Sequence, residues 1–127
     1  MRQRALGNYS LVAFVGTTDP KRAKAFYQDT LGLELRSEDS FALVFDVDGT
    51  ALRVTTVPQV IAAGYTVLGW VVASIDDAVR DLHAAWIAFE RYEGMPQDDR
   101  GVWQAPNGAR VAWFKDPDGN TLSVTQH

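Results

Sequence analysis

The residue types that most often carry catalysis are scarce in this chain of 127 residues. It contains no cysteine and only two histidines, His83 and His127. The missing thiols exclude disulfides, thiolate catalysis and Cys-ligated metal sites, and two histidines do not make a His-rich metal site. No serine has a histidine and an orienting carboxylate to support it, so nucleophilic catalysis finds no basis in the sequence.

Acidic residues are the remaining candidates for acid–base or metal chemistry. Asp46 and Asp48 lie beside an apolar run and could act as a general acid or base, although solvation at a strand end explains them more simply. Glu93, Asp98 and Asp99 could bind a hard cation such as calcium, and a solvated loop is again the commoner explanation. His83 is expected on the surface of a helix, with metal binding as the alternative.

One eight-residue pattern, D-G-x-x-L-x-V-T, occurs twice and organises the chain. The stretch from Asp48 to Thr55 returns seventy residues later as the stretch from Asp118 to Thr125. Such a repeat in a short chain predicts one supersecondary unit built twice, so equivalent positions can be compared directly. The sixth position of the pattern holds Arg53 in the first copy and Ser123 in the second.

The first half of the chain reads as strand, helix and three further strands. Asp19 is a good N-cap, Pro20 suits the first helical position, and Gly32 suits the end of the helix. β-forming residues and polar turns predict the strands Tyr9–Val15, Leu33–Arg36, Phe41–Val47 and Ala51–Thr56.

The same order restarts after residues 57–64, which are predicted to be a linker. Ser74 begins a second helix, whose apolar stripe is predicted to continue as far as Trp86 and Phe89. The predicted strands are Thr66–Val72, Ala88–Tyr92, Ala109–Lys115 and Asn120–Gln126. The sequence therefore predicts an α+β fold of two tandem β-α-β-β-β modules, residues 8–56 and 65–127.

Two segments of the chain carry a family resemblance. Ala25-Phe26-Tyr27-Gln28-Asp29-Thr30-Leu31-Gly32-Leu33 and Trp113-Phe114-Lys115-Asp116-Pro117-Asp118-Gly119-Asn120 closely resemble the vicinal oxygen chelate superfamily. That superfamily groups glyoxalase I, extradiol dioxygenases, fosfomycin-resistance enzymes and bleomycin-resistance proteins. The doubled β-α-β-β-β unit is its module, so the resemblance implies one such domain over residues 1–127, with curved mixed sheets around a cavity. The Asp116–Asn120 turn itself is expected to be structural, its side chains bonding nearby backbone amides.

The resemblance also shows where metal-using members hold their metal. In those members the first and last strand of each module supply one ligand each, usually His and Glu. The corresponding places here are Val12, Arg53, Val67 and Ser123. Two aliphatic side chains, a permanent cation and a neutral hydroxyl are not a ligand set, and Leu11 or Ala13 would not help. We therefore expect no metal and no cofactor.

Strand pleating divides the residues of the repeated pattern between two faces. Leu52, Val54, Leu122 and Val124 should pack under the helices, while Ala51, Arg53, Thr55, Thr121, Ser123 and Thr125 should face the concave side. Trp86 is expected to lie in the core, and Trp70 and Trp113 either in the core or in the cavity. Trp103 is the tryptophan expected to contact a ligand. The predicted ligand-binding residues are Phe14, Arg53, Thr55, Gly69, Trp103, Ser123 and Thr125.

These features favour a metal-free small-molecule-binding protein, similar to bleomycin-resistance proteins, which sequester a ligand in grooves formed with a second subunit. The alternative is a lyase, isomerase or dioxygenase of the same superfamily that uses unorthodox metal ligands or none. Arg53 would suit an anionic or carbonyl-bearing ligand better than a cationic one. The open curved sheets predict a homodimer.

Charge and hydropathy limit the other partners. The net charge is −4 and the basic residues are scattered, so a nucleic-acid partner is not expected. No stretch approaches the length of a membrane span, and residues 1–8 lack the apolar run of a signal peptide. The sequence therefore predicts a cytoplasmic protein with no membrane partner.

Overall fold

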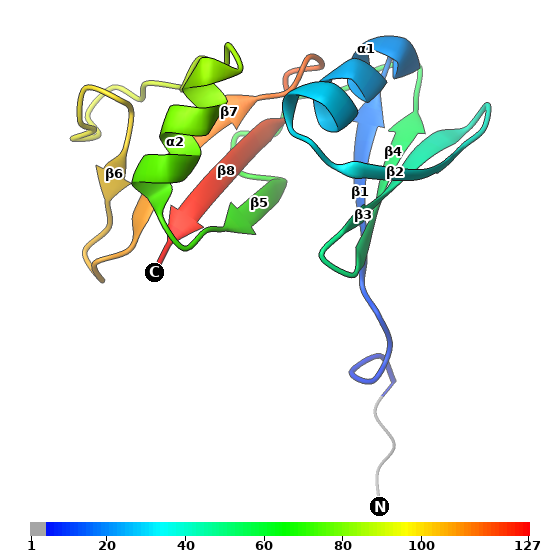
Figure 1. Ribbon diagram of the computed structural model, residues 1–127, viewed down its shortest axis with the longest axis horizontal. Helices are drawn as coiled ribbons and strands as arrows, with labels where there is room; N and C mark the ends of the chain where they lie inside the picture. Colours follow the sequence, from blue (N-terminus) through cyan, green and yellow to red (C-terminus); the bar gives the residue numbers. More distant parts are fainter. Residues whose placement is uncertain (1–4) are drawn as a thin grey trace, which may run out of the picture.

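The computed structural model describes residues 5–127 as two similar β-α-β-β-β modules placed side by side (Figure 1). The first contains β1 (Val12–Thr17), α1 (Pro20–Lys24), the π-helical segment η1 (Ala25–Thr30), β2 (Glu34–Glu38), β3 (Ala42–Val47) and β4 (Thr50–Thr56). The second contains β5 (Leu68–Val71), α2 (Ile75–Ala84), β6 (Trp103–Gln104), β7 (Arg110–Lys115) and β8 (Thr121–Gln126). No helix among residues 5–127 is long and apolar enough to span a bilayer.

Each module forms one four-stranded mixed sheet. The strand orders are β1-β4-β3-β2 and β5-β8-β7-β6, with the pairs β1·β4 and β5·β8 parallel and the others antiparallel. The helix caps are those the sequence predicts: Asp19 accepts a hydrogen bond from the backbone of Arg22, and Ser74 accepts one from that of Asp77. The predicted α+β fold is confirmed.

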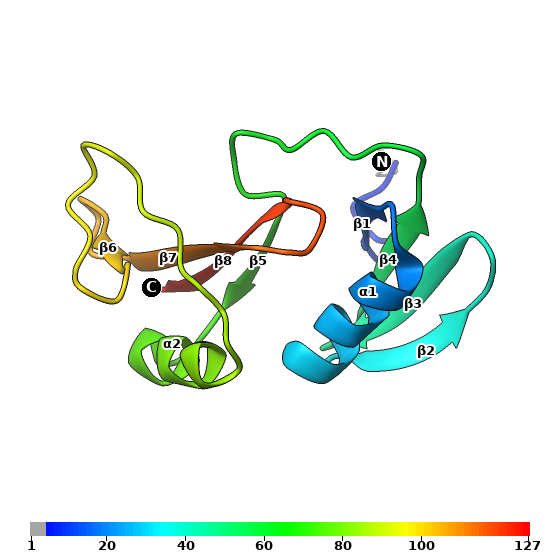
Figure 2. The same cartoon turned by 90° about the horizontal axis from the view of Figure 1, so that it is seen from above.

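A helix covers one side of each sheet, and the core lies between the helices and the sheets. In Figure 2 both helices lie on the lower side, while the outer faces of the two sheets point in different directions. The four residues predicted to lie under the helices are buried, each at most 4% exposed: Leu52, Val54, Leu122 and Val124. Two residues of β8 predicted to face the concave side are buried as well, since Thr121 and Ser123 are 3% and 6% exposed.

The predicted strand Ala88–Tyr92 is wrong. Only a single bridge forms there, between Phe89 and Phe114, and the edge strand of the second sheet is β6 instead. The side chain of Gln97 explains the difference, because its amide donates to the carbonyl of Glu90 at 2.9 Å and its oxygen accepts from the backbone N–H of Tyr92 at 2.8 Å. A side chain thus takes the backbone groups that a neighbouring strand would have paired.

The prediction that Trp86 lies in the core is also wrong. Helix α2 ends at Ala84, and Trp86 follows with a φ of 69° and 94% of its surface exposed. The backbone N–H of Ile87 then bonds to the carbonyl of Leu82 at 3.0 Å and closes the helix end, so that Ile87 takes the buried place. Gly32 holds the equivalent left-handed position, with a φ of 76°, in the first module.

We predict that Trp86→Gly stabilises the protein. Replacing a non-glycine residue in the left-handed conformation by glycine removes backbone strain of about 1–2 kcal/mol. The greater conformational freedom of glycine in the unfolded chain offsets about 0.4–1 kcal/mol of this gain. Urea denaturation should therefore show a gain of about 0.5–1 kcal/mol. Gly32→Ala serves as the matched control and should destabilise; a loss of stability in Trp86→Gly would show that the indole packs usefully.

A buried polar contact joins the two modules. Tyr27, 1% exposed, donates from its hydroxyl to Asp116 Oδ2 at 2.6 Å. Burial, reinforced by the Asp116 carboxylate, raises the pKa of Tyr27 far above its usual value of 10.0, so the hydroxyl remains a donor. Asn120 donates to the same oxygen at 2.8 Å and to the carbonyl of Gly16 at 3.0 Å. The turn between β7 and β8 is therefore fixed to β1 and η1.

Asp118, in the same turn, adds a second set of contacts. Its Oδ2 accepts from the Thr17 hydroxyl at 2.6 Å, and its Oδ1 accepts from the Thr18 backbone at 2.9 Å and hydroxyl at 2.8 Å. Partial burial favours the neutral acid, but the bonds from Thr17 and Thr18 outweigh it and hold the pKa of Asp118 below its usual value. The expected bonds to nearby amides are present too, since Asp116 Oδ1 accepts from the backbone of Asp118 and Asn120.

Tyr27→Phe should weaken this contact without opening a cavity. A buried hydrogen bond to a charged group contributes about 1.5–3 kcal/mol, so we expect the free energy of unfolding to fall by about 2 kcal/mol. Tyr65→Phe, at a position 71% exposed, provides the matched control and should change little. A change below about 0.5 kcal/mol in Tyr27→Phe would mean that the junction does not hold the modules together.

Candidate functional site

The outer face of the first sheet brings three predicted ligand-binding residues together. In the register of β1 and β4, Phe14 lies beside Arg53 and Gly16 lies beside Thr55. Phe14 is 62% exposed, whereas its neighbour Val15 points to the helix side and is buried. Phe14, Arg53 and Thr55 therefore share the face opposite α1, as the pleating predicts.

Arg53 is a half-buried cation without a partner on this face. Among residues 5–127 it has no carboxylate within ion-pair distance and donates no hydrogen bond. Two acidic residues, one in the β2–β3 turn and one on β3, have contacts of their own. Asp39 accepts from the backbone of Phe41 and Ala42, bonds that lower its pKa, with Arg53 adding a smaller effect. Asp46 lies 3.7 Å from Arg36.

Thr55 lies deeper than the sequence suggested. Its hydroxyl oxygen is buried and is the one such side-chain atom without a hydrogen-bond partner in the part of the chain that the structure describes. The linker covers this end of the face, because a Cβ added at Gly16, beside Thr55, would lie 3.0 Å from a methyl group of Val57. A ligand would reach the Thr55 hydroxyl only if the linker shifted.

The outer face of the second sheet holds the other four predicted residues. Gly69 lies beside Ser123 and Val71 beside Thr125, while Trp103 pairs with Val111 of β7. Ser123 is only 6% exposed and so forms the floor of this face rather than an open contact. Gly69 has a steric reason to be glycine, since a Cβ there would lie 2.8 Å from Ser123 Oγ.

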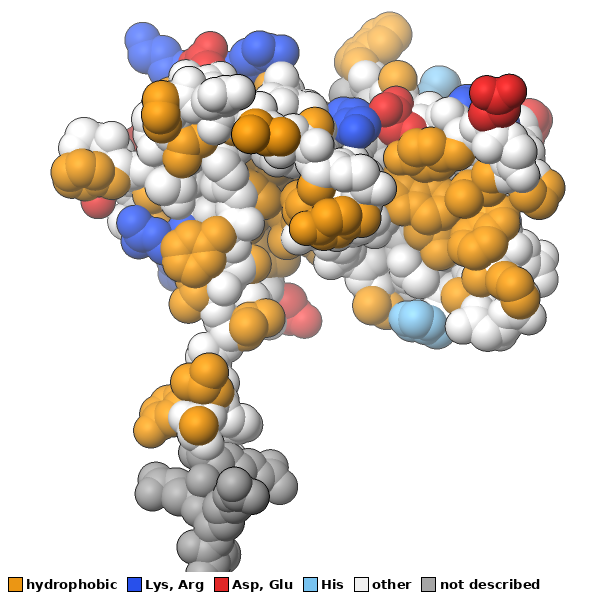
Figure 3. Space-filling model, turned by 180° about the vertical axis from the view of Figure 1, so that it is seen from behind, with side chains coloured by type: hydrophobic (Ala, Val, Ile, Leu, Met, Phe, Trp, Pro, Cys, Tyr) orange, Lys and Arg blue, Asp and Glu red, His pale blue; other side chains and the backbone are white. Residues whose placement is uncertain are grey.

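Three aromatic rings form a platform on this second face. The ring centroids of Trp103 and Trp113 lie 6.0 Å apart, and those of Tyr92 and Trp113 lie 5.5 Å apart. The indole N–H of Trp113 donates to the Thr66 hydroxyl at 3.1 Å, which fixes the ring. Partial burial, with a smaller effect of Glu90, raises the pKa of Tyr92, so its phenol is neutral near pH 7. Figure 3 shows hydrophobic side chains gathered on this side of the second module.

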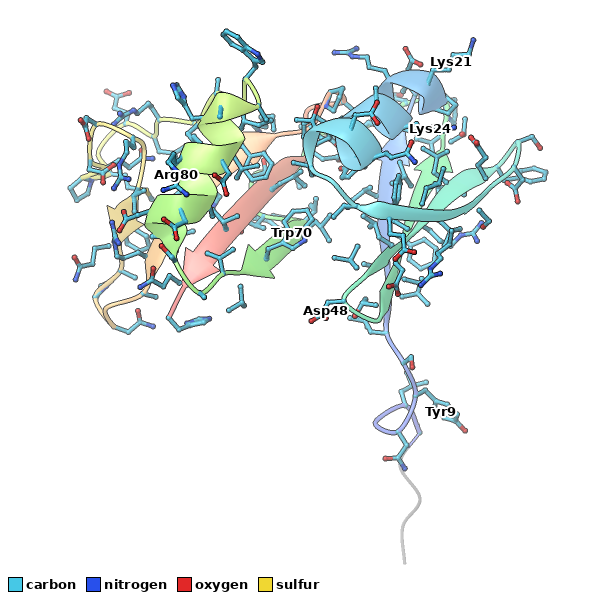
Figure 4. The ribbon with its side chains drawn as sticks, in the orientation of Figure 1. Tyr9, Lys21, Lys24, Asp48, Trp70 and Arg80 are labelled. Carbon is cyan, nitrogen blue, oxygen red and sulfur yellow. The ribbon has the colours of Figure 1, made fainter. Side chains whose placement is uncertain are left out.

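This arrangement resolves the two ambiguous tryptophans and adds a residue that sequence reasoning missed. Trp113 belongs to the outer face, whereas Trp70 points toward the first module (Figure 4) and lines a cavity of about 240 Å³ with Leu31 and Leu33. Tyr92 was predicted as a strand residue only. Its contact with Trp113 depends on the path of the following loop, for which the sequence gives no periodic signal.

The residues at the superfamily's metal positions do not fit a metal. Val12, Arg53, Val67 and Ser123 lie on the outer faces where the resemblance places them, but they supply one neutral hydroxyl and no carboxylate or imidazole. Within residues 5–127 no three His, Cys, Asp or Glu side chains converge in a way that could hold a metal ion.

A larger hollow, of about 1080 Å³, lies on the opposite side of the second module. It runs between α2 and residues 86–100, and none of the predicted ligand-binding residues lines it. Several of its charges are paired. Asp76 accepts hydrogen bonds from Arg110 and Arg100, which hold its pKa at about 2, and Arg80, labelled on α2 in Figure 4, lies 3.2 Å from Asp77. We therefore place the candidate site on the outer faces.

The comparison with known families confirms the resemblance. Residues 10–124 match the sequence model of the Glyoxalase/Bleomycin resistance protein/Dioxygenase superfamily, and the chain belongs to that superfamily. No curated protein matches the chain.

Solved structures of similar shape support the same fold. A lactoylglutathione lyase from Agrobacterium tumefaciens is 20% identical with a TM-score of 0.74, covering 95% of each chain. A superfamily member from Sphaerobacter thermophilus is 22% identical with a TM-score of 0.70, covering 94% of this chain and 97% of the other. A glyoxalase family protein from Enterococcus faecalis is 20% identical with a TM-score of 0.68, covering 95% and 98%. At these identities the likeness shows the fold alone.

We predict that Gly69→Ala destabilises the protein and that Ser123→Ala rescues it. The added methyl group would overlap Ser123 Oγ, and overpacking of this kind costs about 1–3 kcal/mol. In the double variant the oxygen is absent, so thermal unfolding should return close to the Ser123→Ala value. Gly64→Ala, with nothing within 4 Å of the added group, is the neutral control. Additive losses in the double variant would disprove the steric explanation.

Proposed function

We propose that this protein binds a small organic molecule on its outer sheet faces and does so without a metal. The observation that carries the proposal is the composition of these faces. They present the aromatic side chains of Phe14, Trp103 and Trp113 together with Arg53, which has no ion pair among residues 5–127 and occupies one of the positions where metal-using relatives place a ligand. Planar apolar walls with few polar groups are typical of ligand sites.

Each face supplies half of a site, which supports assembly by a second copy of the chain. The outer faces of one chain point in different directions (Figure 2), so neither is closed by the other. The first face holds the cation and Phe14, while the second holds the aromatic platform. In a two-fold dimer, the first sheet of one copy would face the second sheet of its partner and complete a cavity.

The exposed surface supports the same assembly. The chain exposes 8429 Å², whereas a compact monomer of its mass would expose roughly 6,700 Å². Part of the excess lies in the N-terminal segment, where Leu6 and Tyr9 are 79% and 70% exposed and Tyr9 projects from the molecule (Figure 4). The unpaired edge strands β1 and β5 contribute further, since Val12 and Val71 are 43% and 74% exposed. Exposed apolar edges of this kind favour pairing with another chain.

The test combines oligomeric state with ligand-induced stabilisation. We expect light scattering to show a homodimer at micromolar concentration, and a thermal-shift screen of planar organic compounds and divalent metals to find stabilisation by some compounds. Val71→Asp should give a monomer and abolish these shifts, because it places an unpaired charge in the proposed interface. Trp86→Asp, at a residue that is even more exposed and lies outside both edge strands, is the control and should retain both.

Three outcomes would contradict the proposal. A monomeric wild type would remove the composite site. No stabilisation by any organic compound would remove the binding function. Stabilisation by a divalent metal, with metal retained after purification, would favour the alternative of a metal-using enzyme with unorthodox ligands.

A further inference from the structure

We infer that the ligand of this site is a planar aromatic acid whose carboxylate binds Arg53. The inference rests on the proposed function and adds the chemical class of the ligand. It depends on the state of Arg53, on the other charges of the two outer faces and on the aromatic groups around it.

Arg53 differs from most other arginines of residues 5–127 because it lacks an acceptor. Arg36, Arg80, Arg100 and Arg110 each lie within 4.0 Å of a carboxylate, and Arg91 donates to a backbone carbonyl. Arg22 also lacks an ion pair, but it is exposed on α1, away from the outer faces. Arg53 is half-buried on a sheet, so water solvates its guanidinium less fully. A ligand carboxylate would supply the missing acceptors.

The charges around Arg53 favour an anion over a cation. Asp39 and Asp46 are held by the backbone of the β2–β3 turn and by Arg36. On the outer face of the second sheet, Lys115 donates to the Thr121 hydroxyl at 2.8 Å and adds a second positive charge. Arg53 and Lys115 thus carry positive charges that no ion pair within residues 5–127 neutralises, on a chain whose net charge is −4. A ligand bound close to these positive charges responds to them more than to the net charge of the whole chain, because salt screens the charges that lie farther away.

The body of the ligand is expected to be flat and aromatic. Phe14 lies beside Arg53 in the β1·β4 register and leaves most of its ring exposed. In the proposed dimer, Trp103 and Trp113 would approach from the partner's second sheet. Offset or edge-to-face contact with such rings favours planar aromatic groups. The planar fork of a guanidinium binds a carboxylate through two parallel hydrogen bonds, which fixes the orientation of an acid attached to the ring.

The experiment uses sets of three compounds that share one ring system and differ in one substituent. Naphthalene derivatives carrying a carboxylate, a neutral carboxamide or an aminomethyl cation are titrated calorimetrically into the wild-type protein at pH 7. We expect the carboxylate to bind at least tenfold more tightly than the carboxamide, and the cation to bind most weakly. Arg53→Met should abolish the preference for the carboxylate, and Arg53→Lys should retain part of it, since an ammonium lacks the bidentate geometry.

Arg80→Met removes the same charge from the opposite side of the molecule and should keep the wild-type preference. Circular dichroism and light scattering establish that each variant keeps its fold and oligomeric state. Equal binding of all three compounds, or preference for the cation, would overturn the inference and leave the binding function standing. An unchanged preference in Arg53→Met would overturn the role of Arg53. Absence of binding by every compound would overturn the inference and count against the proposed function as well.

Discussion

The two modules of this chain are held together through the carboxylates of one tight turn. Asp116 and Asp118 lie between β7 and β8, and they accept hydrogen bonds from Tyr27, Thr17 and Thr18 of the first module. Buried carboxylates are costly unless hydrogen-bonded, so each contact both satisfies a charge and sets the position of one sheet relative to the other. The direction in which each outer face points depends on this junction, and so does the composite site proposed for a dimer.

The internal repeat makes the asymmetry of that junction visible. Asp48 occupies the position of Asp118 in the first copy of the repeated pattern, yet it is exposed and makes no hydrogen bond among the described residues (Figure 4). The repeated Asp-Gly pair thus lies in a turn in both modules, but only Asp118 joins the modules. The two turns also differ in backbone, since Asp48 has a φ of 48° and sits between the paired residues Val47 and Thr50, whereas the turn of Asp118 joins Lys115 and Thr121. A motif that forms a turn in both copies acquires its second role only where the neighbouring module presents hydroxyl donors.

The outer faces show a comparable division between scaffold and chemistry. The resemblance to metal-using members of the superfamily implies four ligand positions on the strands of the two sheets, and this chain has those strands with other side chains at the four positions. Arg53 is a permanent cation at a position where the resemblance to metal-using members implies an acid, and the proposed preference for an anionic ligand rests on that difference. Gly69 and Ser123 form a tight steric pair, so even the departures from the superfamily pattern are packed specifically.

Sequence periodicity by itself predicted the doubled β-α-β-β-β order, both helix caps and the division of β4 and β8 into a buried and an outer face, because these depend on local spacing. It could not predict that Trp86 leaves the core or that Tyr92 joins the aromatic platform. The first follows from where the backbone of α2 closes at Ile87, and the second from Gln97 holding the loop. The tertiary structure alone decided which carboxylates join the modules and that Arg53 has no ion pair among the described residues 5–127, since both depend on groups distant in the chain.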